Sequence, residues 1–199
     1  MKLNIGSGAK FLDGYINIDI NPKLKVDIVM DAWDLKFDNE TADEIMAIHF
    51  IEHLGFFKAK YFLSECYRVL KDSGRLLIET PHIERSFEYF LKAKDKKERE
   101  IVLSWIYGSE SKYMNHIFCF PVELIFDLAS EFGFNIEKVE YYDYEFLRPA
   151  VKYSMVKIKE ANKTEKSLYR KKLILNKIPD LEDELKLAEI EKDIKSKFK

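Results

Sequence analysis

A glycine loop that directly follows a short apolar run near the N-terminus constrains the fold of this chain most. Residues 3–8 read Leu-Asn-Ile-Gly-Ser-Gly, so a strand-like run stops at two glycines one residue apart. Glycine lets the backbone turn sharply and lie against a ligand. Because ligands of open α/β sheets bind outside the carboxyl ends of the strands, the stretch predicts a first strand that ends in a binding loop. Taken alone, the pattern fits an ordinary tight turn better.

Two further strand-like runs follow and end in acidic residues. Residues 15–19 end at Asp19, and residues 26–31 end at Asp31. Three successive strands of this kind would deliver the glycines and both acids to one edge of a parallel sheet, which favours a binding loop over a simple turn. The connecting segments, 9–14 and 21–25, are too short for the helices that usually join parallel strands. We therefore expect loops there.

The rest of the chain continues the alternation of strands and helices. Apolar residues spaced near 3.6 positions apart indicate helices, and strict alternation indicates strands. The predicted elements, in order, are a strand at 42–49, a helix at 58–71 stopped by Ser73-Gly74, a strand at 75–80, a broken helical region at 83–107, a helix at 121–131, and two antiparallel strands at 135–144 and 152–158.

Composition and charge bound the domain organisation. The 199 residues are 47% hydrophobic and 14% aromatic, enough to bury a single core. We predict one domain at 1–160 and a charged helical extension at 161–199. The extension carries 11 Lys or Arg and 8 Asp or Glu, so the domain before it has a net charge of −5. Binding nucleic acid needs a basic surface, so we expect a small-molecule or glycan partner and no nucleic acid.

The cysteines and the lengths of the apolar runs indicate the compartment. Cys66 and Cys119 lie far apart without a Cys-x-x-Cys spacing, so neither a thiolate zinc site nor a disulfide framework is predicted. Cys66 falls in the apolar stripe of the predicted 58–71 helix and is assigned to the core. No apolar run reaches the length of a transmembrane segment, and the first strand leaves no room for a signal peptide. We expect a cytoplasmic protein.

Residues 49–53, at the end of the predicted fourth strand, contain the pattern His-x-x-Glu-His. On a helix this spacing brings two imidazoles to one metal ion, as in the inverted zincins. Here the preceding residues are strand-like and no third ligand is evident. We therefore expect no metal site and keep a metal hydrolase only as a distant alternative.

Two other stretches are candidates for ligand binding. After the third strand, Asp31 can accept a hydrogen bond from an amino group of a flat ring while Trp33 packs on its face. Residues 105–116 are irregular and dense in aromatic and hydrogen-bonding groups, a composition common in lids and substrate walls. An aromatic core loop that contains a satisfied histidine fits this second stretch about as well.

Gathered together, these motifs resemble the class I S-adenosylmethionine-dependent methyltransferases. The similarity is greatest to a small group with Glu-His-Leu after the fourth strand and Arg-Val-Leu-Lys-x-x-Gly before the fifth, and it covers about residues 3–160. It implies an α/β, Rossmann-like sheet of seven strands in the order 3-2-1-4-5-7-6, with strand seven antiparallel. Lys10 stands where the family usually has a third loop glycine, and the gap between Gly8 and Asp19 is short. The matching motifs lie at residues 3–8, 19, 31, 52–54, 67–71 and 74–76.

The resemblance also implies the cofactor, S-adenosylmethionine, and its site. Gly6 and Gly8 would approach the methionine part, Asp19 would bind the ribose hydroxyls, and Asp31 with Ala32 would contact the adenine. The expected cofactor-binding residues are Asn4, Gly6, Ser7, Gly8, Asp19, Asp31, Ala32, Trp33 and His49.

Methyl transfer is an in-line displacement, so the protein mainly positions donor and acceptor and removes a proton from a hydroxyl acceptor. Histidine suits that base. We expect His116 to be the base, with His49 as the second candidate and His53 structural. We predict transfer to a small-molecule, sugar or lipid-linked acceptor, most readily at oxygen. The expected acceptor-binding residues are Glu52, His82, Tyr107, Tyr113 and Asn115.

The extension at 161–199 carries apolar stripes that can fold back on the sheet, bind a membrane or pair with a second copy. We favour a homodimer, because two short helices cannot bury both stripes on each other and also cover the sheet. A non-catalytic scaffold with the methyltransferase fold remains an alternative function. Absence of cofactor binding would favour that alternative.

Overall fold

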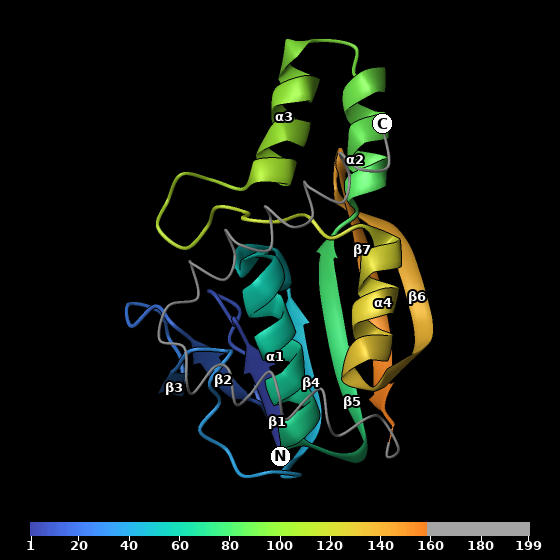
Figure 1. Ribbon diagram of the computed structural model, residues 1–199. Helices are drawn as coiled ribbons and strands as arrows, with labels where there is room; N and C mark the ends of the chain where they lie inside the picture. The colour runs from blue at the N-terminus through green and yellow to red at the C-terminus, as the bar shows by residue number, and fades with distance from the viewer. Residues whose placement is uncertain (159–199) are drawn as a thin grey trace, which may run out of the picture.

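The computed structural model describes residues 1–158, in which seven strands form one mixed sheet in the order β3-β2-β1-β4-β5-β7-β6 (Figure 1). This order is the predicted one. The strands are β1 (Lys2–Ile5), β2 (Ile16–Asp19), β3 (Ile28–Val29), β4 (Ala42–Ile48), β5 (Leu70–Pro81), β6 (Phe134–Glu145) and β7 (Arg148–Lys157). The helices are a short 3-10 helix η1 (Ile51–His53), α1 (Gly55–Val69), α2 (Ile83–Lys92), α3 (Lys96–Tyr107) and α4 (Val122–Phe132).

The first five strands run parallel, and β7 lies antiparallel between β5 and β6. Both features confirm the predicted topology. No helix joins β1 to β2 or β2 to β3 in the described residues, again as expected from the short connections. Parallel strands therefore bring their carboxyl ends to one edge, and the loops after β1, β2, β3 and β4 meet there (Figure 1).

The helix that precedes β5 ends earlier than its sequence pattern indicated. We predicted a helix at 58–71 stopped by Ser73-Gly74, but α1 ends at Val69 and Leu70 already has an extended backbone. Pairing between β4 and β5 begins with Ala42 opposite Leu70. These strand hydrogen bonds outweigh the local helical preference, so Ser73-Gly74 lies inside a long β5 instead of stopping the helix.

The core lies between the centre of the sheet and helices α1 and α4, which share one face (Figure 1). Apolar side chains at helical spacing on α1 pack there, among them Phe62 and Cys66, both fully buried. The prediction that Cys66 belongs to the core is thus confirmed. Burial of these side chains fixes α1, and with it the loops that it supports at the carboxyl edge.

Helices α2 and α3 form a hairpin that projects beyond the carboxyl edge of the sheet (Figure 1). The predicted break in the helical region is confirmed at Asp95, whose carboxylate accepts a hydrogen bond from the Glu98 amide at 3.0 Å and caps α3. Residues 108–120 then return to α4, which ends at Gly133 in a left-handed conformation with φ of 80°.

None of the helices in residues 1–158 is long and apolar enough to cross a membrane. The predicted extension at 161–199, and the homodimer expected through it, lie outside the described residues.

Candidate functional site

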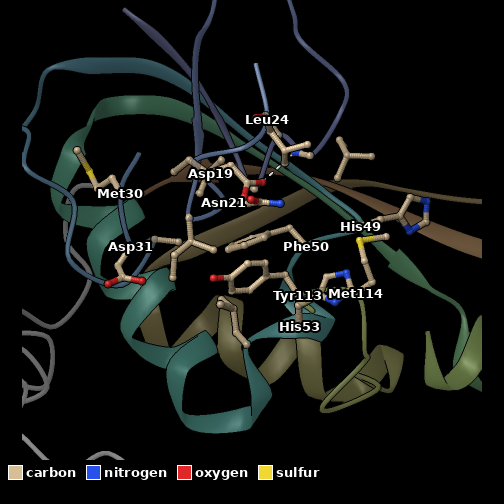
Figure 2. A pocket seen from close by; sticks show the side chains of 18 of the residues that line it. Asp19, Asn21, Leu24, Met30, Asp31, His49, Phe50, His53, Tyr113 and Met114 are labelled. Atoms are coloured by element: carbon tan, nitrogen blue, oxygen red, sulfur yellow. Dashed lines mark hydrogen bonds between the residues drawn. The ribbon is translucent and has the colours of Figure 1, made fainter. Parts of the chain in front are cut away.

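A cavity of about 570 Å³ lies at the carboxyl edge of the sheet. Its walls come from the loops after β1, β2, β3 and β4 and from residues 112–115 and Ile117, which belong to the loop after α3 (Figure 2). Phe50 and Tyr113 lie between Asp31 and His49 in this view. The predicted site residues that line the cavity are Gly6, Ser7, Gly8, Asp19, Asp31, Ala32, Trp33, His49, Tyr113 and Asn115.

The two loop glycines have different structural roles. Both are left-handed, with φ of +64° at Gly6 and +54° at Gly8. A Cβ added at Gly6 would lie 1.9 Å from the ring of Phe50, whereas one added at Gly8 would meet no protein atom within 4 Å. Gly6 therefore makes room for Phe50, whereas Gly8 lines the cavity and has open space where a side chain would begin.

The acid at the end of β2 is tied to this loop. Oδ2 of Asp19 accepts a hydrogen bond from the Gly8 amide at 2.9 Å, and Oδ1 accepts one from the Asn21 amide at the same distance. The short segment between Gly8 and Asp19 thus brings the two residues together. Each carboxylate oxygen has a second lone pair, so Asp19 can still accept hydrogen bonds from the hydroxyls of a ligand.

The acid after β3 has an oxygen that no described residue satisfies. Oδ1 of Asp31 and the hydroxyl of Ser7 are both buried without a hydrogen-bond partner in residues 1–158. Burial raises the pKa of Asp31 above its usual 3.8, and the positive charge of Lys58 opposes this effect. A buried acceptor without a partner costs free energy, so these atoms favour a ligand that brings its own donors.

Helix α1 holds the loop that carries Asp31. The Leu35 amide donates a hydrogen bond to Glu65 at 2.9 Å, and Arg68 donates to the Leu35 carbonyl at 2.7 Å. Arg68 and Glu65 also form an ion pair at 2.6 Å. This support fixes the wall formed by Asp31 and its neighbours against a buried helix.

Next to Asp31, Ala32 and Trp33 complete this end of the cavity. Ala32 is only 5% exposed, and Nζ of Lys58 lies 4.8 Å from the centre of the Trp33 ring. Small and aromatic side chains beside unsatisfied acceptors suit a flat ring that carries an amino group. The cavity, the open side of Gly8 and the free acceptors therefore fit the nucleoside cofactor that the sequence indicated.

His49, at the other end of the cavity, sits between two carboxylates. Its Nε2 lies 3.0 Å from Glu79 Oε1, and its Nδ1 lies 3.5 Å from Glu52 Oε1. Burial lowers the pKa of His49, but the carboxylates outweigh burial and raise it to about 9. His49 is therefore protonated near neutral pH and unsuited to act as a base there.

Two other histidines lie together beside the cavity. Their rings meet edge to face, with centroids 4.9 Å apart. Nδ1 of His53 donates to the Asn115 carbonyl at 2.9 Å, and Nδ1 of His116 donates to the Ile106 carbonyl at 3.1 Å. A carbonyl only accepts, so the neutral ring carries its hydrogen on Nδ1 and keeps a lone pair on Nε2. Burial lowers the pKa of His116, which favours this neutral form.

Of this pair, His53 lines the cavity and His116 does not. His116, the histidine that we expected to be the base, contacts the cavity wall through the ring of His53. We expected His53 to be structural. Its partners in the structure, Asn115 and His116, lie some sixty residues away in the chain. Only the folded loop after α3 reveals the pair.

The remaining predicted site residues lie outside the cavity lining. Asn4 donates hydrogen bonds to the Lys10 carbonyl at 3.1 Å and to Asn17 Oδ1 at 2.9 Å. It therefore stabilises the segment between β1 and β2, which contains the glycine loop. His82 caps α2 by accepting from the Arg85 amide at 3.4 Å. Tyr107 is 67% exposed, and Glu52 is fully buried close to His53 and His116.

The His-x-x-Glu-His alternative is wrong, because the segment is not a continuous helix. β4 ends at Ile48, His49 has a φ of 50°, and η1 is a single short turn. His49 contacts Glu79 and the ring of Trp105, whereas His53 contacts Asn115 and His116. The two imidazoles of the motif therefore do not converge on one ion.

Comparison with known proteins agrees with this architecture. Residues 6–78 match a family model described as a methyltransferase domain. No curated protein matches the sequence.

Solved structures share the fold at low sequence identity. An S-adenosylmethionine-dependent methyltransferase from Methanosarcina mazei is 17% identical with a TM-score of 0.55, over 79% of this chain and 92% of that chain. A putative methyltransferase from Bacillus halodurans is 14% identical with a TM-score of 0.56, over the same shares. A possible histamine N-methyltransferase from Thermotoga maritima is 16% identical with a TM-score of 0.53, over 78% and 81%.

Proposed function

We propose that this chain is a class I S-adenosylmethionine-dependent methyltransferase that methylates an oxygen of a small-molecule, sugar or lipid-linked acceptor. The methyltransferase-domain match over residues 6–78 and the strand order support this proposal. When bound, S-adenosylmethionine supplies an electrophilic methyl group on a sulfonium sulfur. Asp31 would accept from the adenine amino group and Asp19 from the ribose hydroxyls. The cationic His49 would face the carboxylate of the methionine part.

Oxygen as the acceptor atom is supported by the histidine pair at the cavity wall. A hydroxyl must lose its proton as it is methylated, and a neutral imidazole with a free Nε2 can take it. His53 and His116 each present a free Nε2 in the neutral form, because each Nδ1 donates to a backbone carbonyl. His53 lines the cavity, so we assign proton acceptance to the pair, with His53 nearest to the acceptor.

The loop after α3 would form the acceptor wall through Tyr113 and Asn115, both at the cavity. This loop is docked on η1, because the Ile117 and Phe118 amides donate to the Glu52 carbonyl at 2.8 and 3.1 Å. These hydrogen bonds fix the positions of the histidine pair and the proposed acceptor residues relative to one another, which favours precise positioning of donor and acceptor.

An acceptor screen that measures S-adenosylhomocysteine release tests this proposal. We expect release with a hydroxylated compound and none with the matched deoxy compound. His53→Asn should lower turnover much more than cofactor affinity, because the pair acts on the acceptor. Release with amines or thiols alone, or an unchanged turnover in His53→Asn, would contradict oxygen transfer through this pair.

A further inference from the structure

Glu52, His53 and His116 lie close enough together to share a ligand. One ligating atom from each residue lies within 4.8 Å of the other two. Glu52 and His53 come from η1, and His116 comes from the loop after α3, which is docked on η1 by main-chain hydrogen bonds. The cluster therefore depends on the fold and not on a local sequence motif.

Both histidines are oriented as metal ligands usually are. In metal sites the second ring nitrogen commonly donates to a carbonyl or carboxylate, which fixes the tautomer and turns the other nitrogen to the ion. Here the Nδ1 atoms of His53 and His116 donate to the carbonyls of Asn115 and Ile106, at 2.9 and 3.1 Å. Neither carbonyl belongs to a flexible side chain, so the two Nε2 lone pairs are held in place.

The third member of the cluster, Glu52, contributes a buried carboxylate. The residue is fully buried, and although Oε2 accepts from the Thr80 hydroxyl at 3.2 Å, Oε1 has no hydrogen-bond partner in residues 1–158. Oε1 lies 3.5 Å from His49 Nδ1 in an ion-pair contact. Burying a carboxylate is costly unless its oxygens are satisfied. Glu52 therefore brings to the cluster a buried carboxylate with bonding capacity that no hydrogen bond within residues 1–158 uses.

We propose that Glu52, His53 and His116 bind a divalent transition-metal ion of the zinc type. Two imidazoles and one carboxylate are the protein ligands of open zinc sites, in which a further position is left for water or substrate. Nitrogen ligands suit zinc and its transition-metal neighbours, whereas magnesium and calcium prefer oxygen. Zinc binds imidazole nitrogen at about 2.0–2.1 Å, so each of the three ligating atoms would have to move toward the ion by less than ~1 Å.

His53 belongs to both the cluster and the cavity wall. An ion held by the cluster would therefore lie beside the space proposed for the acceptor. With the ion bound, both Nε2 atoms would be coordinated and could not take the proton. The ion would instead lower the pKa of an acceptor hydroxyl in the open coordination position, and the proton would pass to water. This role rests on the proposed function, whereas metal binding itself does not.

The test is metal titration of the metal-free, untagged full chain, without cofactor or acceptor. Isothermal titration with Zn²⁺ and visible absorption with Co²⁺ should both show saturable binding of one ion, and Mg²⁺ should give none. His53→Gln and His116→Gln should each weaken Zn²⁺ binding by more than about 10-fold, since even outer partners of metal ligands contribute that much. His82→Gln, which changes a histidine outside the cluster, should bind like wild type.

Absence of saturable Zn²⁺ binding, or equal weakening in His82→Gln, would overturn the metal site. Circular dichroism and thermal melting of each variant separate lost binding from lost folding. Glu52→Gln should also weaken Zn²⁺ binding. If this variant fails to fold because Glu52 is buried, the two histidine variants still test the metal site. S-adenosylmethionine binding by the same metal-free protein is measured in parallel, so that failure of the metal site and failure of the proposed function give different results.

Discussion

The Gly8 amide donates a 2.9 Å hydrogen bond to Asp19 Oδ2, which ties the glycine loop after β1 to the acid at the end of β2. The loop and the acid therefore form one rigid wall of the cavity. Rigid walls lower the cost of ordering a ligand site, and this wall would be in place before cofactor binds.

Gly8→Ala should reduce affinity for S-adenosylmethionine and S-adenosylhomocysteine by roughly 10-fold or more, a loss on the order of 1–2 kcal/mol. Gly8 lines the cavity, and no protein atom lies within 4 Å of the added methyl group, so it would compete with the ligand for this space. Isothermal titration measures the change.

Gly14→Ala is the matched control, because Gly14 is also left-handed, at φ +81°, and also has open space around it, but it does not line the cavity. Both substitutions should cost about 1–2 kcal/mol of folding free energy from the backbone conformation. An equal loss of affinity in the two variants would show that Gly8 acts through folding alone.

Asp31→Asn should weaken cofactor binding by roughly 10- to 100-fold, because a charged acceptor of a hydrogen bond is replaced by a neutral one. Burial holds the folded-state pKa of Asp31 above 3.8. The ionised carboxylate therefore lowers stability as pH rises above that value, and Asp31→Asn should melt at the same or a higher temperature at pH 7.

Asp34→Asn, three residues on and outside the cavity lining, should leave cofactor affinity unchanged. If Asp31→Asn bound cofactor as wild type does, the unsatisfied Oδ1 would need a different explanation.

The meeting of Gly8, Asp19 and Asp31 at one cavity could be predicted from the sequence because these residues follow strands directly. Gly8, Asp19 and Asp31 each lie at or just after the end of a parallel strand, so recognising three strands already places them at one edge. The short connections between those strands, which lack helices, were predicted for the same reason. Local patterns suffice where strand order alone positions a residue.

The acceptor end could not be predicted in the same way. His53 lies in a single 3-10 turn, and its partner His116 reaches it through long-range hydrogen bonds between main-chain groups. No periodicity in the sequence records such a contact. The cluster of Glu52, His53 and His116 could not be predicted from the sequence for this reason, since His116 is supplied by the loop beyond α3.

His49 should make stability depend on pH. Its folded pKa of about 9 exceeds the ordinary value of 6.5, so the stabilisation is full below pH 6.5 and is lost as pH rises toward 9. In urea unfolding of the metal-free protein, the free energy of unfolding of wild type should fall by a few kcal/mol more between pH 6 and 10 than that of His49→Gln. If the free energy of unfolding of the two proteins depended on pH in the same way, stabilisation of protonated His49 by Glu52 and Glu79 would be contradicted.

The homodimer expected through residues 161–199 remains a prediction. Its apolar stripes would be buried by a second copy. Light scattering should give a dimer for the full chain and a monomer for a 1–160 truncation. Two monomers would exclude the extension as a dimerisation element, and binding of the full chain alone to anionic vesicles would favour a membrane role instead.

Isothermal titration of the full chain with S-adenosylmethionine tests the central claim most directly. The cavity, its unsatisfied acceptors and the wall formed by Gly8 and Asp19 predict saturable binding of one cofactor per chain, weakened in Gly8→Ala and Asp31→Asn and retained in Gly14→Ala. No heat of binding at millimolar S-adenosylmethionine, from protein shown to be folded, would contradict it.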